Sequence, residues 1–182
     1  MTLSGLAGEG LPQPLPEAIT SSREGSLIMI PTTSDQREDL RRLIGRWHGS
    51  ETMMASPWTA AGPAESLVET ELALDGAYIF QNYRQSREDA SSFEARAVFG
   101  YDEERKQPAM YLFDTMGFPP SEPAYGVIEG EHLVFTRRSP RGQGQHRFRF
   151  DDGTYQLVVR FAPPDGPWAT VMEGSYKLVP FA

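Results

Sequence analysis

The segment YLFDTMGFPP, at residues 111–120, places a carboxylate among aromatic and thioether side chains. Asp114 follows Phe113 and precedes Met116 by two residues, and the Gly-Phe-Pro-Pro sequence after it favours a bent loop at a strand end. A carboxyl group in a dry pocket has a raised pKa and can move a proton to or from a bound molecule. The alternative is that Asp114 stabilises the turn by accepting backbone N–H groups, which is the commoner role of such residues.

A second carboxylate, Glu173 in ATVMEGSYK, could do the same chemistry with the hydroxyl of Tyr83 or Tyr111 as a donor. Glu173 could also pair with Arg160 inside a cavity and hold a polar head group. Surface positions suit both residues better, because long charged side chains rarely enter a core unpaired. The sequence has no GxSxG, P-loop or GxGxxG motif, so a cofactor-free enzyme doing proton transfer or isomerisation stays one of several hypotheses.

A further set of residues combines aromatic, thioether, hydroxyl or carboxylate groups with positions that could face a pocket. We predict that the following residues contact a ligand: Trp58, Tyr83, Phe99, Tyr111, Asp114, Met116 and Met172. Trp58 follows Met53 and Met54 in a loop, where an exposed indole could line a portal. The same loop could equally fold down as a small hydrophobic cluster, and both alternatives stay open.

Histidine and cysteine, which most often hold metals, are scarce. The chain has no cysteine, and its three histidines, His48, His132 and His146, show no metal-ligand spacing, so we predict neither a metal site nor a cofactor. A haem-binding barrel would need an axial histidine inside its cavity, and His146 is in phase with Phe148 and Phe150 for that position. A hydrogen-bonded core or rim histidine is the commoner outcome.

The charge balance and the hydropathy pattern disfavour several classes of partner. With 25 acidic and 17 basic side chains the formal net charge is -8, which repels nucleic acid. Residues 1–14 lack the basic and apolar regions of a secretory signal, and no stretch approaches the roughly 20 apolar residues that span a bilayer. We predict a soluble, cytoplasmic protein with no membrane partner, and a homodimer stays open.

The helix and strands that must position these side chains are predicted from the turn and loop residues that separate them. Residues 1–32 carry Pro, Gly and Ser with little periodicity and predict a flexible tail, and residues 33–182 predict a single barrel domain. That domain begins with a short amphipathic helix over residues 33–45, whose C-terminal end is marked by Gly45. About ten strands follow, and they begin near Trp47, Leu67, Ala77, Phe93, Met110, Tyr125, Leu133, His146, Tyr155 and Thr170.

These strands predict an all-β fold, an antiparallel up-and-down β-barrel. Hairpin-length connections without intervening helices argue against a parallel α/β sheet. In FEARAVFGY, residues 93–101, apolar residues alternate with Glu and Arg, so one face is covered, and a closed sheet achieves this without a second layer. The small Ala95 and Ala97 on the covered face predict a cavity, and Trp47 is expected to close one end of the barrel.

Four motifs follow one another in a fixed order: LIGRWHGSE at 43–51, ELALDGAYIFQNYRQ at 71–85, ARAVFGYDEERKQPAMYLFDTMGFPP at 95–120 and MEGSYK at 172–177. Together they resemble a bacterial family of domains of unknown function with a lipocalin-like (calycin) barrel. The similarity covers about residues 35–177. The resemblance implies a calycin fold and a small-molecule pocket, and it implies no established reaction.

One leading hypothesis and two alternatives follow. The chain is predicted to bind a small, largely apolar molecule in the barrel cavity. The first alternative is the cofactor-free enzyme with a cavity carboxylate. The second is an oligomeric interaction module that uses the outer barrel face or the tail.

Overall fold

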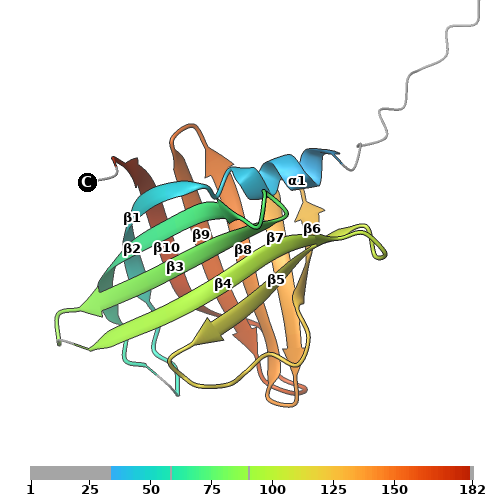
Figure 1. Cartoon of the computed structure of the whole chain (residues 1–182). Helices are drawn as coiled ribbons and strands as arrows, with labels where there is room; N and C mark the ends of the chain where they lie inside the picture. Colours follow the sequence, from blue (N-terminus) through green and yellow to red (C-terminus); the bar gives the residue numbers. More distant parts are fainter. Residues whose placement is uncertain (1–33, 58, 90, 181–182) are drawn as a thin grey trace, which may run out of the picture. The chain divides into compact units, whose positions relative to one another are not determined.

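Figure 1 shows the computed structural model of the chain, which describes residues 34–57, 59–89 and 91–180. These residues form helix α1 (Ser34–Arg41) and ten strands. The strands are β1 (Gly45–Met53), β2 (Gly62–Ala73), β3 (Tyr78–Arg87), β4 (Ser92–Asp102), β5 (Gln107–Asp114), β6 (Ala124–Glu129), β7 (His132–Ser139), β8 (Gly142–Asp151), β9 (Thr154–Ala162) and β10 (Ala169–Val179). The predicted tail at residues 1–32 and Trp58 lie outside the described residues.

Each strand pairs antiparallel with the next, and β1 also pairs with β10, which closes the sheet into a barrel (Figure 1). The closing seam runs from Arg46 opposite Val179 to Met53 opposite Met172. The all-β, up-and-down fold of about ten strands is therefore confirmed. In the described part of the chain, no helix is long and apolar enough to cross a membrane.

Helix α1 covers one end of the barrel, here called the helix end. The guanidinium of Arg37 lies 4.5 Å from the ring centroid of Tyr101 at the end of β4, and that of Arg42 lies 4.7 Å from the ring centroid of Phe150 at the end of β8. The hairpins β1–β2, β3–β4 and β7–β8 turn at the opposite end, here called the open end.

The helix ends at Arg41, so the predicted end at Gly45 was wrong. After Arg41 the chain forms 3₁₀-type turns. The N–H of Leu43 and that of the next residue bond to carbonyls three positions earlier. The carbonyl of Leu43 accepts the indole N–H of Trp47 at 2.9 Å instead of extending the helix. Gly45, with a φ of 140°, begins β1 in a conformation that favours glycine.

The helix end is packed solid. Trp47 is 5% exposed, and its ring meets the ring of Tyr155 edge-on at a centroid distance of 5.0 Å. Tyr155 stacks on Tyr176 at 4.3 Å, and Phe99 packs against Phe135 at 5.6 Å. These rings belong to one continuous core cluster, so the helix end has a filled interior with Trp47 inside it.

The interior of the open end is packed less fully. The residues at inward-facing positions here follow the same two-residue alternation as the core residues, but part of their surface stays accessible. The residues of this kind are Met53, Tyr83, Phe93, Leu112, Asp114, Arg137, Gly144, His146, Val159 and Phe161. The barrel is thus filled at one end and accessible at the other.

Strands β5 and β6 pair over only a short length of the barrel wall. These strands share two residue pairs, Ala109 opposite Tyr125 and Met110 opposite Ala124. Beyond Met110, β5 continues to Asp114 without pairing to β6, and the chain then crosses to β6 through residues 115–123. That connection is held near the β7–β8 turn by Arg141, whose guanidinium lies 3.2 Å from the ring centroid of Phe118.

Candidate functional site

A buried carboxylate, Glu51 of β1, lies inside the barrel between the two ends and is 4% exposed. Its Oε1 accepts hydrogen bonds from the hydroxyls of Ser66 at 2.6 Å and Tyr176 at 2.5 Å. Its Oε2 accepts the side-chain N–H of Gln85 at 2.6 Å, and the Tyr83 hydroxyl lies 2.8–2.9 Å from both oxygens. These donors come from β2, β3 and β10, so Glu51 joins four strands. We call these five residues the Glu51 cluster.

Two glycines make room for the cluster. A Cβ atom on Gly49 would lie 2.5 Å from Cε1 of Tyr176, and one on Gly174 would lie 2.7 Å from Cε2 of the same ring. The Tyr176 ring therefore fits between two inward positions that carry no side chain. This placement lets its hydroxyl reach Glu51.

The protonation of the cluster follows from burial and charge. Burial raises the pKa of the Tyr83 phenol well above its ordinary value, and the charge of Glu51 and its hydrogen bond add to the effect. Burial and the charge of Glu51 also raise the pKa of Tyr176. Both phenols keep their protons and act as donors, so the two oxygens of Glu51 accept hydrogen bonds from four side chains.

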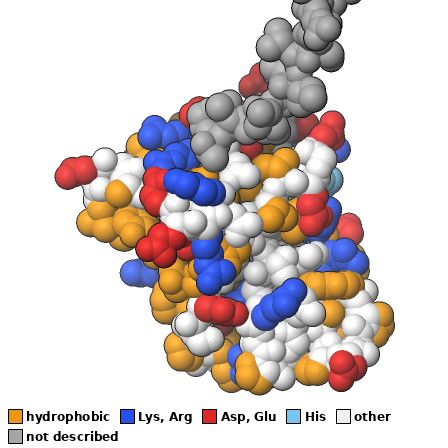
Figure 2. Space-filling model, turned by 90° about the vertical axis from the view of Figure 1, so that its right-hand side faces the viewer, with side chains coloured by type: hydrophobic (Ala, Val, Ile, Leu, Met, Phe, Trp, Pro, Cys, Tyr) orange, Lys and Arg blue, Asp and Glu red, His pale blue; other side chains and the backbone are white. Residues whose placement is uncertain are grey.

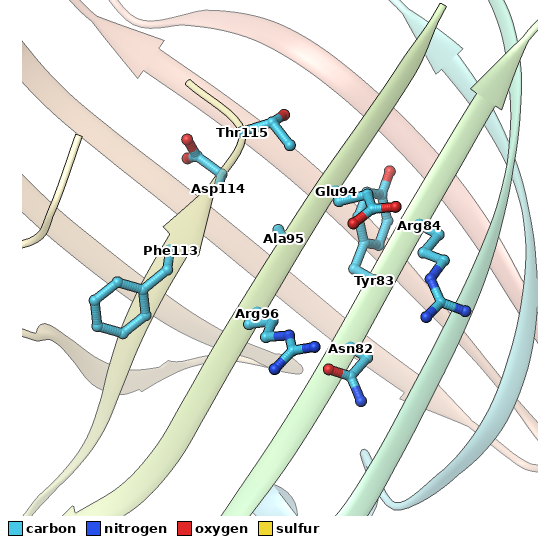
Figure 3. Close-up of a pocket in the computed structure, with 9 residues that line it drawn as sticks. All are labelled: Asn82, Tyr83, Arg84, Glu94, Ala95, Arg96, Phe113, Asp114 and Thr115. Carbon is cyan, nitrogen blue, oxygen red and sulfur yellow. The ribbon is translucent and has the colours of Figure 1, made fainter. Parts of the chain in front are cut away.

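A hollow of about 240 Å³ adjoins the cluster where β3, β4 and the end of β5 lie side by side (Figure 3). Its inward-facing lining residues are Tyr83, Ala95 and Asp114. The other six lining residues lie on the outer face of these strands or just after β5, so the hollow reaches the outside of the barrel wall: Asn82, Arg84, Glu94, Arg96, Phe113 and Thr115. Tyr83 belongs to both the hollow and the Glu51 cluster, and it connects the two.

The model of one protein family, described as protein of unknown function (DUF1579), matches residues 32–177. The chain belongs to this family. The resemblance found in the sequence is therefore confirmed over nearly the same range.

Solved structures show the same fold at low sequence identity. The S-type phycobiliprotein lyase CPES from Guillardia theta superimposes with a TM-score of 0.59 at 11% identity, covering 80% of this chain and 93% of that one. Rv2717c from M. tuberculosis gives a TM-score of 0.59 at 10% identity, covering 79% and 96%. No curated protein matches the chain. At these identities the likeness shows the fold alone.

The predicted ligand contacts of this DUF1579 member fall into separate regions. Tyr83 and Asp114 line the hollow, whereas Phe99 and Met172, 0% and 6% exposed, lie in the packed core. Tyr111 points outward from β5 and is 41% exposed, because its neighbour Met110 occupies the inward position. Met116 is 44% exposed in the following loop, and Trp58 lies outside the described residues. The structure thus brings two of the predicted contacts together, and the ligand-binding role stays a prediction.

The carboxylates named in the sequence have different surroundings. Asp114 accepts the backbone N–H of Met116 at 2.9 Å, which is the turn-stabilising interaction weighed as an alternative. Glu173 is exposed on the outer face of β10, and Arg160 lies 5.5 Å from the ring centroid of Trp168. Sequence reasoning missed Glu51, although it follows Trp47 by four residues and is therefore in phase with that inward ring.

His146 faces the interior of the open end. Burial lowers its pKa to about 4, with a smaller effect from the positive charge of Arg137. The residue as a whole is partly buried, whereas Phe148, two residues on and in the same phase, is 2% exposed. Within the described ranges, no group of three or more His, Asp or Glu side chains could hold a metal ion.

The outer surface mixes charge and apolar groups. On the face in Figure 2, basic and acidic side chains are interspersed with hydrophobic ones rather than gathered by sign. Exposed aromatic residues of the outer wall include Phe80, Tyr111 and Phe113, at 39%, 41% and 48% exposure. A binding assay for the interior must therefore distinguish it from this outer apolar surface.

Proposed function

We propose that this barrel binds a small, largely apolar molecule in the interior of its open end. The observation that carries the proposal is the contrast in burial along the barrel. Leu133, Phe135 and Phe148 are 0–2% exposed near the helix end, whereas inward residues of the same strands, such as Arg137 and His146, keep accessible surface at the open end. A protein with one filled core has no need of this second, accessible interior.

Two alanines on β4 support the same proposal. Ala97 is 3% exposed and belongs to the core cluster. Ala95, two residues away on the same face, is 8% exposed, lies outside that cluster and is in the lining of the 240 Å³ hollow. The same small side chain is therefore packed in one place and borders open space in the other.

The polar groups on the interior side of the hollow favour an apolar ligand. The Tyr83 hydroxyl is committed to Glu51, and Asp114 accepts the N–H of Met116. The remaining residue on this side is Ala95, whose side chain is a methyl group. A molecule bound there gains more from burial of apolar surface than from new hydrogen bonds with these residues.

The test uses the neutral dye N-phenyl-1-naphthylamine, whose fluorescence rises in apolar surroundings. The wild-type protein is expected to bind it saturably. The substitution Ala95→Phe places a large ring on the inward face of β4 at the open end and is expected to weaken dye binding about tenfold. Native mass spectrometry of the purified protein provides a second readout, because a molecule that is retained from the host cell adds a discrete mass.

The control is Phe80→Ser, which removes an apolar side chain that is 39% exposed on the outer wall and does not line the hollow. It is expected to leave dye binding unchanged. The proposal is overturned if the wild type does not bind the dye. It is also overturned if Phe80→Ser removes binding while the folded Ala95→Phe protein keeps it.

A further inference from the structure

Arg137 lies on the interior face of β7 near the open end. Inward positions on this strand alternate, and Leu133 and Phe135 are 2% and 0% exposed in the core cluster. Arg137 follows in the same phase and is directly opposite Gly144 of β8, just as Phe135 is opposite His146. Arg137 and His146 therefore project from neighbouring strands into the same interior.

The guanidinium of Arg137 is only partly exposed and has no ion pair or side-chain hydrogen bond within the described ranges. Arg147 shows the contrast, because on the outer face of β8 it pairs with Glu129 at 2.8 Å. A partly desolvated guanidinium is stabilised most by a planar anion that accepts two parallel N–H groups.

Open space lies at Gly144, opposite Arg137. A Cβ atom added to Gly144 would have no atom within 4 Å. On β9, Phe161 lies opposite Gly144 and Val159 lies opposite His146, and both side chains keep accessible surface. One guanidinium thus faces an opening with an apolar wall.

His146 completes the polar edge of this opening. Its imidazole is neutral near pH 7, because burial and the charge of Arg137 hold its pKa at about 4. Among the described residues nothing forms a hydrogen bond with its ring. A neutral imidazole has one N–H to donate, and a carboxylate held by Arg137 would still have lone pairs to accept it.

We propose that Arg137 and His146 form a subsite for the carboxylate of a small molecule whose apolar body lies against Phe161 and Val159. This inference rests on the proposed binding function and adds the charged group of the ligand. A monoanion fits better than a phosphate dianion, because one guanidinium faces the opening and Glu51 adds negative charge to the same barrel interior.

The test compares octanoate with 1-octanol, which share an alkyl chain and differ in the charged group, as competitors of N-phenyl-1-naphthylamine. The wild type is expected to bind octanoate about tenfold more tightly than 1-octanol. Arg137→Met is expected to remove this preference and keep dye binding, whereas Arg137→Lys keeps part of the preference. Arg138→Met is the control, because Arg138 is exposed on the other face of β7 and should not affect the preference.

The dye separates the two proposals. Dye binding without a preference for octanoate, or a preference that survives Arg137→Met, overturns the carboxylate subsite and leaves the binding function standing. Failure of the wild type to bind either the dye or octanoate overturns both. Arg137→Gln is a second neutral variant for the same comparison if the methionine variant does not fold.

Discussion

The Tyr83 hydroxyl lies 2.8 Å from Oε2 and 2.9 Å from Oε1 of Glu51, a residue 32 positions earlier in the chain. This bond crosses from β3 to β1 inside the barrel and reaches a buried carboxylate that has no ion-pair partner among the described residues. Buried charge is tolerated only where hydrogen bonds replace water. The Glu51 cluster is therefore both a structural tie between strands and a source of negative potential within the interior.

Removing the carboxylate is expected to destabilise the fold strongly. Glu51→Ala leaves the donors of Ser66, Tyr83, Gln85 and Tyr176 without their acceptor, and a loss of about 3–5 kcal/mol in the free energy of unfolding is expected. Urea denaturation followed by circular dichroism measures it. Glu65→Ala is the matched control, because the Glu65 side chain on β2 is 56% exposed, and its loss should stay below about 1 kcal/mol. Equal losses for the two variants would contradict a special role for the cluster.

Two glycines provide a paired test of where the interior is full. Gly49→Ala places a Cβ 2.5 Å from the Tyr176 ring and is expected to cost about 1–3 kcal/mol. Gly144→Ala meets no atom within 4 Å and is expected to be neutral or to stabilise by up to about 1 kcal/mol, since alanine restricts the unfolded chain. Thermal and urea unfolding of both variants measure the difference. If Gly144→Ala costs as much as Gly49→Ala, the open end is packed more tightly than the structure indicates.

The pH dependence of stability should contain a contribution from His146. Its pKa is about 4 in the folded protein and 6.5 for an ordinary histidine, so between these values the unfolded chain binds a proton that the folded protein does not. The free energy of unfolding therefore falls as the pH drops through this window. From pH 7 to pH 5 the loss attributable to His146 is about 2 kcal/mol.

Urea unfolding at pH 7 and pH 5 checks this value in the wild type and in His146→Gln, which cannot titrate. The difference between the two pH values should shrink by about 2 kcal/mol in the variant. His132→Gln is the comparison variant, and His146→Gln is expected to change the dependence more than it does. An unchanged pH dependence in His146→Gln would show that the imidazole is not held in its neutral form.

The sequence patterns predict the barrel well and its interior polar groups poorly. The face of a strand on which a residue lies follows from alternation along that strand alone. The alternation from Phe93 to Tyr101 therefore correctly identified the inward face of β4. The same logic places Tyr111 outside, because Met110 next to it faces Phe99 across β4 and β5. Tyr111 was assigned to the pocket on its chemistry, and strand phase would have been the better guide.

Glu51 shows why the rest could not be read from the chain. In the segment HGSETM a glutamate flanked by Ser50 and Thr52 is typical of a solvated strand edge. Its burial depends on donors as distant as Tyr176, 125 residues away, and on the β1–β10 register that brings them together. Such long-range pairing is set by closure of the barrel and leaves no local signature.

Trp47 offers a last test, because its role can be separated from that of the open end. Its indole N–H donates to the Leu43 carbonyl at 2.9 Å, and its ring packs against Tyr155. Trp47→Phe keeps an aromatic ring but leaves that carbonyl without its donor and removes buried volume, so a loss of about 2–4 kcal/mol in the free energy of unfolding is expected. Trp168→Phe is the control, since Trp168 is only partly buried beside Arg160, and its loss should stay near 1 kcal/mol.

Affinity for N-phenyl-1-naphthylamine should be unchanged in the folded Trp47→Phe protein, because the filled helix end separates the indole from the accessible interior. A weakened affinity at full folding would place Trp47 at the ligand and would contradict the division of the barrel into a packed end and a binding end.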